Sequence, residues 1–384
     1  QACLNSAEHE KNQGRKVLNV PNLRFKEFQG EWEKCKLLKI CTFFSGGTPS
    51  SSNKDFYGGN IPFIRSGELH ADSTELFITQ AGFDSSSAKM VEIGDLLLAM
   101  YGATSGDIAV SKIKGAINQA ILCIRTKQNK KFIESVWNKH VSKNLRKYLQ
   151  GGQGNLSADI IKGISFSFPT LKEQEKIANL VSLLDERIAT QNKIIDKLQS
   201  LIKGISNRIF ASIQGIEYRM GDIVTITNGN SNVQDAVTQS KDGLYPFFDR
   251  SEDIKYLPTF LFDKEAIIYP GEGTEFMPRY FKGKFALHQR CYAIFDFNEI
   301  INARFLYFYL KTRNSYFVKN AVGSTVPSLR LDTFQMLKVI IPPTKTQHSV
   351  SSCLSSMEQK CNVEKKILYK LLNQKQYLLR QMFI

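Results

Sequence analysis

The sequence predicts an α+β protein in which two similar globular domains are separated by two long antiparallel helices. Three observations lead to this prediction. The second half of the chain repeats the first. Each copy contains a long proline-free run in which apolar residues recur at alternating steps of four and three, which is the period of a coiled coil. The remainder has short apolar runs broken by Gly, Pro, Asn and Ser, without a βαβ alternation, and this favours α+β over a doubly wound sheet.

The internal repeat is clearest where each globular domain ends. Pro169 corresponds to Pro342, and Gln174 corresponds to Gln347 at the same spacing. Upstream the spacing drifts because loop lengths differ, but the order of features holds. The matching stretches are "IPFIRSG" (61–67) with "YPFFDRS" (245–251), "GDLLLAMYG" (94–102) with "KEAIIYPGEG" (264–273), and "INQAILCI" (117–124) with "LHQRCYAI" (287–294). We therefore predict a pseudo-two-fold internal repeat of one mixed domain followed by one helix.

The two helical runs have the apolar seam of a coiled coil, and the obvious partner of each helix is the other. Seam positions include Ile177, Leu184, Leu198, Met357 and Leu371. Gln191 interrupts the first seam and Glu364 interrupts the second at the equivalent place. A polar seam residue lowers stability but fixes register. If the helices run antiparallel with matched spans, Gln191 and Glu364 form one polar layer at mid-length. The alternative is that each helix only caps its own domain.

These features divide the chain into five segments. They are an N-terminal extension at 1–19, a first domain at 20–170, a first spacer helix at 171–213, a second domain at 214–343 and a second spacer helix at 344–384.

Charge and composition point to an anionic macromolecule as partner. The net charge is +15 over 384 residues, which favours nucleic acid or an anionic membrane over a small neutral substrate, with a merely soluble basic protein as the alternative. Residues 102–150 hold ten Lys or Arg against two acidic residues, so most of the excess lies in the first copy. No apolar run is long enough to span a membrane. The odd count of seven Cys supports no disulfide framework and fits a reducing cytoplasm.

The motifs of common catalytic sites are absent. The glycine-rich stretch "FFSGGTPSSSNKDFYGGN" (43–60) resembles a phosphate loop at first sight, but no Lys-Ser or Lys-Thr follows its glycines. "GEG" (271–273) lacks the third glycine of a dinucleotide fingerprint. The five His are scattered without metal-ligand spacing. We therefore predict no catalytic residue, no metal site and no cofactor of the chain's own.

Two stretches resemble one known family. "SGGTPSSSNKDFYGGNIPFIRSGEL" (45–69) is similar to the opening of a target-recognition domain, and "FPTLKEQEKIANLVSLLDERI" (168–188) is similar to the helical region that follows such a domain. Together they resemble the specificity (S) subunit of type I restriction-modification enzymes. The resemblance covers about residues 20–384, and the helical motif occurs twice at the spacing that the family requires. The second domain departs from the pattern, because "ITNGNSNVQD" (226–235) replaces the Gly-Gly-Thr-Pro stretch.

The resemblance implies a non-catalytic DNA-binding subunit. Each domain would read one half of an asymmetric, interrupted double-stranded DNA sequence. The helices would act as a spacer and as docking sites for two methyltransferase (M) subunits, and restriction (R) subunits would add to these. S-adenosylmethionine, ATP and Mg²⁺ would then belong to the partner subunits.

Candidate DNA contacts are polar and cationic side chains on predicted loops, because such groups read base edges and bind phosphates. In the first domain they are Thr48, Ser50, Asn53, Lys54, Arg65, Ser66, Tyr101, Thr104, Ser105, Lys112 and Lys114. In the second domain they are Asn228, Asn230, Asn232, Arg250, Glu272, Thr274, Arg279, Tyr280, Lys282 and Lys284. The pairs at 118–119 and 288–289 occupy equivalent places and are read equally well as buried amides or as DNA contacts.

Two other functions stay open at this point. One is a scaffold or adaptor whose coiled coil and domains bind proteins, and the other is an independent nuclease built from dispersed carboxylates.

Overall fold

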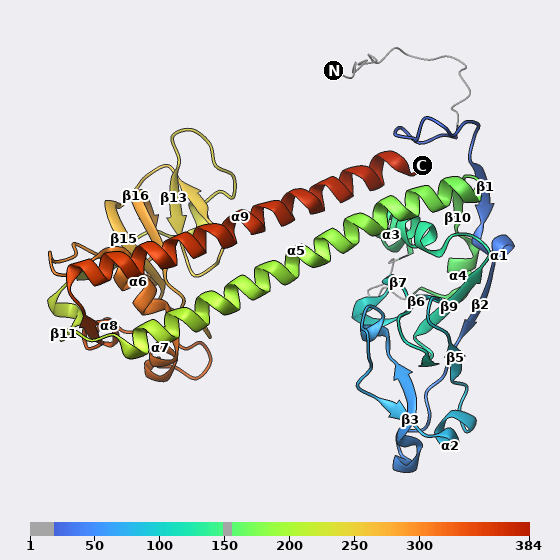
Figure 1. The fold of residues 1–384 in the computed structure, drawn as a ribbon, viewed down its shortest axis with the longest axis horizontal. Coiled ribbons are helices and arrows are strands. Elements are labelled where there is room, and N and C mark those ends of the chain that lie inside the picture. The colour runs from blue at the N-terminus through green and yellow to red at the C-terminus, as the bar shows by residue number, and fades with distance from the viewer. Residues whose placement is uncertain (1–18, 149–155) are drawn as a thin grey trace. The chain divides into compact units, whose positions relative to one another are not determined.

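The computed structural model describes residues 19–148 and 156–384, with the backbone alone described at 142–148 (Figure 1). Most of the predicted N-terminal extension therefore lies outside the described residues. The chain forms two compact units. The first unit comprises the chain up to Thr190 together with Tyr369–Ile384, and the second comprises Gln191–Leu368. No helix within the described ranges is both long and apolar enough to cross a lipid bilayer.

Among its described residues, the first unit has three small sheets and four short or medium α-helices before its long helix. One sheet has the order β2 (Cys41–Ser45), β9 (Ile121–Thr126), β6 (Leu96–Ala99), β7 (Ile108–Val110). A second has the order β4 (Phe77–Ile78), β3 (Tyr57–Ile64), β8 (Gly115–Ile117), β5 (Lys89–Val91). A third pairs β1 (Glu33–Lys36) with β10 (Ser165–Phe168). The helices are α1 (Leu37–Ile40), α2 (Gln80–Asp84), α3 (Lys130–Tyr148) and α4 (Ala158–Gly163).

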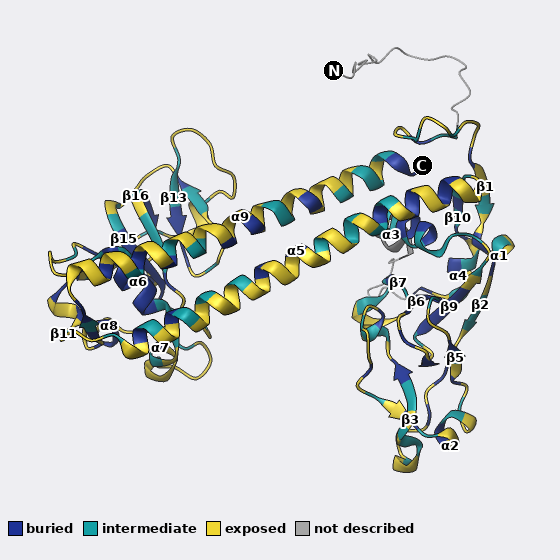
Figure 2. Ribbon diagram, viewed as in Figure 1, coloured by how far each residue is buried: buried dark blue, intermediate teal, exposed yellow. Residues whose placement is uncertain are grey.

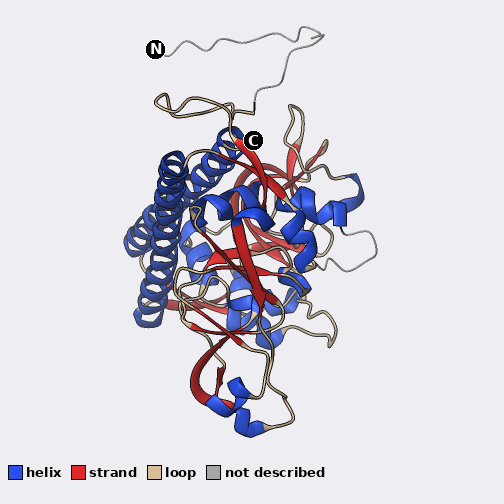
Figure 3. Ribbon diagram, turned by 90° about the vertical axis from the view of Figure 1, so that its right-hand side faces the viewer, coloured by secondary structure: helices blue, strands red, loops and turns tan. Residues whose placement is uncertain are grey.

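The second unit has the same design with fewer strand breaks. Its six-stranded sheet has the order β12 (Thr225–Asn228), β17 (Cys291–Phe295), β15 (Phe262–Pro270), β16 (Arg279–Leu287), β13 (Tyr245–Phe248), β14 (Lys255–Leu257). A separate pair joins β11 (Ile216–Arg219) to β18 (Lys338–Ile341). The short helices are α6 (Ala303–Lys311), α7 (Asn314–Asn320) and α8 (Leu331–Gln335). The helices and strands of both units are shown in blue and red in Figure 3.

Strand register confirms that the two domains are copies. In the first unit β3 runs parallel to β8, and Ile64 lies beside Ile117. In the second unit β13 runs parallel to β16, and Phe248 lies beside Leu287. The single strand β16 occupies the place of β7 and β8. The predicted fold class, an α+β repeat with two long helices, is therefore confirmed, whereas the five predicted segment boundaries stay predictions.

The long helices are α5 (Leu171–Ser212) and α9 (Thr344–Met382), and buried positions recur along each of them (Figure 2). The motif Pro-x-x-x-x-Gln at the start of each helix has a structural cause. Gln174 donates to the carbonyl oxygen of Pro169 at 2.9 Å and accepts from the main-chain N–H of Asn129 at 3.1 Å. Gln347 makes the equivalent bonds in the second unit, to Pro342 at 2.9 Å and from Asn302 at 2.7 Å. Each amide thus ties the first turn of its helix to the adjacent domain.

The end of each long helix completes a core built by the other copy. In the first unit Phe383, which follows α9, packs on Phe132 of α3 with ring centroids 5.2 Å apart. In the second unit Phe210 of α5 packs on Phe305 of α6 at 5.5 Å. Phe210 corresponds to Phe383 in the repeat, and Phe132 to Phe305. Because all four rings are at most 3% exposed, each core includes an aromatic ring from the opposite copy.

Gln191 and Glu364 form the polar layer that the antiparallel alignment predicts. The Gln191 side-chain N–H donates to Glu364 Oε2 at 2.6 Å and to the Glu364 carbonyl oxygen at 3.2 Å. Both residues are buried, and Lys360 reaches Glu364 at 2.6 Å. The hydrogen bonds from Lys360 and Gln191 lower the pKa of Glu364. Gln191 and Glu364 are equivalent positions of the two copies. Contact between equivalent positions is what a two-fold internal repeat requires at its axis.

Replacing Gln191 by Glu is expected to destabilise the helix pair in a pH-dependent way. Two carboxylates would share one buried layer, so the folded-state pKa of the pair rises above the unfolded value of about 4.3. The free energy of unfolding of the variant, compared with that of the native protein, is therefore highest below the unfolded-state pKa. It falls as pH rises through the folded-state pKa. Urea unfolding of both proteins between pH 4 and pH 8 measures the difference.

The matched control is Glu364→Gln, which removes the charge and leaves an amide pair. We expect a small, pH-independent loss for this variant above pH 5. A Gln191→Glu protein whose stability follows that of the native protein at every pH contradicts the buried layer.

Candidate nucleic-acid interface

Three segments of the first unit meet where β8 ends and β9 begins. The loop after β2 lies so close to this turn that a Cβ added to Gly46 would stand 1.7 Å from the Ile117 carbonyl oxygen. The Thr48 hydroxyl donates to Gln119 Oε1 at 2.5 Å. The main-chain N–H of Met100 donates to the Ala120 carbonyl oxygen at 2.8 Å. We call residues 46–50, 100–105 and 118–120 the first loop cluster.

The second unit has an equivalent arrangement, which we call the second loop cluster (residues 228–232, 271–274 and 288–290). A Cβ on Gly229 would stand 2.0 Å from the Leu287 carbonyl oxygen. The main-chain N–H of Ser231 donates to the same oxygen at 3.1 Å, and that of Gly271 donates to Arg290 at 2.9 Å. The second unit therefore has "NGNSN" (228–232) where the first has "GGTPS" (46–50), but both stretches keep a glycine, Gly46 or Gly229, whose main chain lies close to the turn. The glycines serve close packing of main chains in both copies.

Most candidates of the first unit lie in or beside the first loop cluster. Thr48, Ser50 and Tyr101 are exposed, while Thr104 and Ser105 are half-buried and the Ser105 hydroxyl donates to the Met100 carbonyl oxygen at 3.0 Å. Asn53 accepts from the main-chain N–H of Asp55 at 3.1 Å, next to the exposed Lys54. Arg65 and Ser66 directly follow β3, whose last residue pairs with Ile117, so they belong to the same edge. Candidates from three stretches (48–50, 65–66 and 101–105) therefore lie at this edge, whereas Asn53 and Lys54 precede the opposite end of β3.

Candidates of the second unit also gather at their turn. The Asn228 side chain donates to the Gln289 carbonyl oxygen at 3.3 Å, and Glu272 pairs with Arg290 at 2.7 Å. Asn230, Asn232, Arg250 and Thr274 are exposed. Arg250 has no hydrogen bond or ion pair to any other residue that the structure describes.

Four lysines of the candidate set are not part of the loop clusters as defined above. Lys112 and Lys114 follow the opposite end of β7, where they pair with Asp72 at 2.7 Å and Glu92 at 3.0 Å. Lys282 and Lys284 stand in the middle of β16, and the spacing between the copies makes them equivalent to Lys112 and Lys114. Lys282 is 3.9 Å from Glu265, and Lys284 Nζ lies 4.8 Å from the centre of the Phe260 ring. Each of these lysines therefore has a carboxylate or an aromatic ring as its neighbour.

Arg279 and Tyr280 are engaged by the fold itself. The Arg279 guanidinium donates to the carbonyl oxygens of Asp249 and Ser251, the latter at 2.9 Å, and burial lowers its pKa. The Tyr280 hydroxyl donates to Glu265, and its ring lies 3.6 Å from the Arg304 guanidinium carbon. Burial, followed by the Glu265 bond, raises the pKa of Tyr280 to about 12. Both side chains therefore stabilise neighbouring strands, and their assignment as DNA contacts stays a prediction.

Sequence reasoning left out His70 and Asp107, which lie beside the first loop cluster. His70 Nε2 is 2.9 Å from Asp107 Oδ1, and this hydrogen bond raises the pKa of His70. The two residues are far apart in sequence, so only the folded structure reveals the contact.

Three lysines of the Lys-rich segment 130–147 have structural partners. Lys130 donates to the Gly94 carbonyl oxygen at 2.6 Å, Lys131 pairs with Asp185 at 2.8 Å, and Lys139 donates to the Phe383 carbonyl oxygen. Lys143, Arg146 and Lys147 lie outside the described side chains. Among the residues that the structure describes, no group of three or more His, Cys, Asp or Glu is placed to hold a metal ion.

A family model for the type I restriction modification DNA specificity domain matches this chain twice, over residues 29–200 and 216–373. The chain belongs to this family. Each match covers one copy of the internal repeat together with helical residues that follow it. The specificity-domain family is thus present in tandem, as the resemblance of the two helical motifs implies.

Individual relatives agree with the family match. The MjaIX specificity subunit of Methanocaldococcus jannaschii is 23% identical over 88% of this chain and 89% of its own length. The EcoDI specificity subunit of Escherichia coli is 28% identical, over 36% of this chain and 30% of its own length. The chain therefore spans less than a third of that relative. The crystal structure of a type I restriction-modification S subunit from M. genitalium has the same fold, with a TM-score of 0.67, 16% identity, and coverage of 95% of this chain and 99% of that one.

Proposed function

We propose that this chain is the DNA-specificity subunit of a type I restriction-modification complex. Each unit reads one half of a bipartite, asymmetric target in double-stranded DNA, and helices α5 and α9 dock two methyltransferase subunits. The observation that carries the proposal is the tandem family match together with two loop clusters of the same construction. Neither the family match nor the geometry favours a scaffold or an independent nuclease.

The side chains on the two clusters support an asymmetric target. The first cluster exposes Thr48, Ser50 and Tyr101, whereas the second exposes Asn230, Asn232 and Arg290. Base edges are distinguished by the pattern of donors and acceptors that a protein presents to them. Since the backbones match and the side chains differ, the two units are suited to different half-sites.

The same proposal assigns catalysis and cofactor binding to the partner subunits. The chain itself is non-catalytic and binds no cofactor. S-adenosylmethionine is held by the methyltransferase subunits, and ATP and Mg²⁺ are held by restriction subunits that join the complex. The complex acts in the cytoplasm, where chromosomal DNA lies.

The test is to co-express the chain with the methyltransferase encoded beside its gene and to map methylated bases genome-wide, with and without the chain. We expect a stable complex and one bipartite motif that depends on the chain. A complex that does not form, or methylation that is the same without the chain, overturns the proposal.

Reversing the charge of Lys112 and Lys114 to Glu is expected to weaken DNA binding by the assembled complex on all sequences. If both lysines contact phosphates, affinity falls roughly tenfold or more and the slope of log affinity against log salt flattens by about 2. Fluorescence anisotropy at several salt concentrations measures both quantities. The control is Lys162→Glu with Lys172→Glu, two exposed or half-exposed lysines of the same unit outside the candidate set. If the salt slope is unchanged, the lysines at 112 and 114 do not face DNA.

A further inference from the structure

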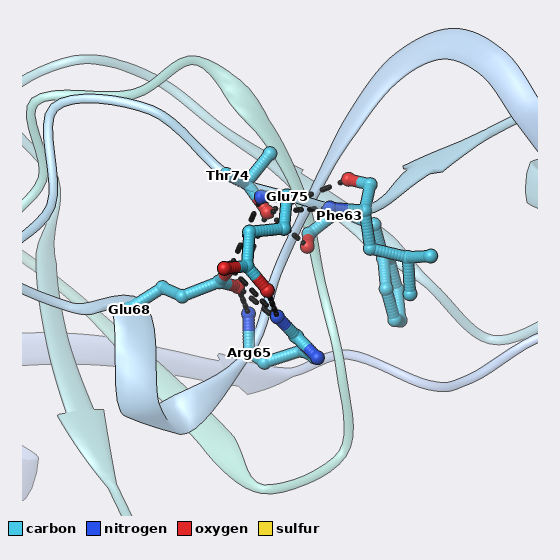
Figure 4. Close-up of polar contacts among 6 residues, drawn as sticks. Phe63, Arg65, Glu68, Thr74 and Glu75 are labelled. Carbon is cyan, nitrogen blue, oxygen red and sulfur yellow. Dashed lines mark hydrogen bonds and ion pairs between the residues drawn. The ribbon is translucent and has the colours of Figure 1, made fainter.

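Arg65 is held by a carboxylate on one side of its guanidinium. Arg65 Nε donates to Glu68 Oε2 at 3.2 Å and Nη2 donates to Glu68 Oε1 at 2.9 Å (Figure 4). The main-chain N–H of Arg65 also donates to Glu68 at 3.0 Å. This side-on pair fixes the plane of the guanidinium. The orientation of the end-on face of the Arg65 guanidinium, which carries the outer hydrogens of Nη1 and Nη2, is therefore fixed.

Glu68 is itself fixed and ionised. The main-chain N–H of Glu75 donates to Glu68 Oε1 at 3.1 Å, and the Glu68 side chain is only 14% exposed. Partial burial raises the pKa of Glu68, but the hydrogen bonds from Arg65 outweigh it and lower the pKa to about 2. A charged, immobile carboxylate therefore supports Arg65 at neutral pH.

A second carboxylate occupies part of the end-on face. Glu75 Oε2 accepts from Arg65 Nη2 at 3.0 Å, while no described residue accepts from Nη1. The Glu75 side chain is 88% exposed. A solvent-exposed ion pair of this kind adds little stability, so another acceptor displaces Glu75 easily. Glu75 thus stands where an external acceptor pair would bind.

Arg65 lies at the edge of the sheet where the first loop cluster begins. Arg65 follows Ile64 at the end of β3, and Ile64 pairs with Ile117, which precedes the turn at 118–120. The equivalent residue of the second unit is Asp249, which is buried and accepts from Lys255 at 2.6 Å. The residue at this one position therefore differs between the units, with an arginine in the first and an aspartate in the second.

We propose that Arg65 reads a guanine in the half-site of the first unit, with Glu68 as the positioning residue and Glu75 as a displaceable substitute for the base. This inference rests on the proposed function. A guanidinium whose end-on face is free donates two parallel hydrogen bonds to O6 and N7 of guanine in the major groove. Lysine cannot reproduce this pair, because its ammonium is a point charge without a planar fork.

The test compares variants in the complex with the methyltransferase. Arg65→Ala and Arg65→Lys are expected to keep the bipartite motif except at one guanine of one half-site, where discrimination against other bases falls roughly tenfold or more. Glu75→Gln is expected to raise DNA affinity at fixed salt by up to roughly fivefold. Methylation mapping and anisotropy provide the two readouts, and complex assembly and melting temperature show that the variants fold.

Arg125→Ala is the matched control. Arg125 is 45% exposed, against 44% for Arg65, and it forms a similar side-on pair with Asp95 through Nε and Nη2. It lies near the end of β9, away from the turn at 118–120. This variant removes the same charge and is expected to leave the motif unchanged.

The possible results distinguish a failure of the Arg65 assignment from a failure of the proposed function. If the motif is unchanged in both Arg65 variants, the inference is overturned and the proposed function stands. A uniform loss of affinity without a change of motif assigns Arg65 to a phosphate and also overturns the guanine contact. A Glu75→Gln variant with lower or unchanged affinity overturns the substitute role of Glu75. If the native complex methylates no defined motif, the proposed function fails and the inference fails with it.

Discussion

Replacing Phe132 by Ala is expected to lower the free energy of unfolding by about 3–5 kcal/mol. The ring is fully buried and packs on Trp32, Phe168 and Phe383 at centroid distances of 5.7, 6.0 and 5.2 Å. Truncation removes the transfer free energy of the ring and leaves a cavity that rigid neighbours fill only in part. Denaturant unfolding monitored by tryptophan fluorescence measures the loss.

The control for Phe132 is Phe77→Ala, a truncation of the same size on β4. Phe77 is 37% exposed, so we expect a much smaller change. Equal losses for the two variants would show that Phe132 does not occupy the core described above. Phe305→Ala provides an independent test, because it is the repeat equivalent of Phe132 and is also fully buried.

Replacing Gly46 by Ala is expected to cost about 3 kcal/mol, near the upper end for overpacking. The added Cβ would meet the Ile117 carbonyl oxygen at 1.7 Å, and a main-chain oxygen cannot move aside as a flexible side chain does. The loop after β2 must therefore shift away from the turn at 118–120. Thermal unfolding measures the loss, and methylation mapping reports whether the half-site of the first unit is still read.

Gly67→Ala controls for the loss of a glycine in the same unit. Nothing lies within 4 Å of a Cβ at that position, so stability is expected to change little. A Gly46→Ala protein as stable as the Gly67→Ala protein would refute the close approach. Gly229→Ala repeats the experiment in the second unit, where the equivalent distance is 2.0 Å.

The features that were predicted correctly depend on spacing along the chain. The seam of α5 and α9 and the layer of Gln191 with Glu364 follow from a heptad count and a matched antiparallel alignment. The repeated Gln174 and Gln347 were visible as a motif, although their role as ties between helix and domain appeared only with their partners. Spacing works for these features because a helix converts sequence distance directly into position.

The features that sequence did not reveal depend on partners from distant segments. Gly46 looked like loop geometry, but its need for glycine comes from the Ile117 carbonyl oxygen. Arg279 and Tyr280 looked like surface residues because Asp249 and Arg304 are remote in sequence. Acceptor and donor partners of this kind follow from strand pairing, which a single sequence does not specify.

The contribution of α9 to the first unit has a consequence for synthesis of the protein on the ribosome. The second unit is one continuous segment, Gln191–Leu368, so all its contacts are available once that segment has emerged. The core around Phe132 needs Phe383, which is translated 251 residues later. Domains generally fold as units during translation, with the N-terminal one first. Here the nascent first unit exposes part of its apolar core until α9 and Phe383 have left the exit tunnel, after the whole of the second unit has been translated.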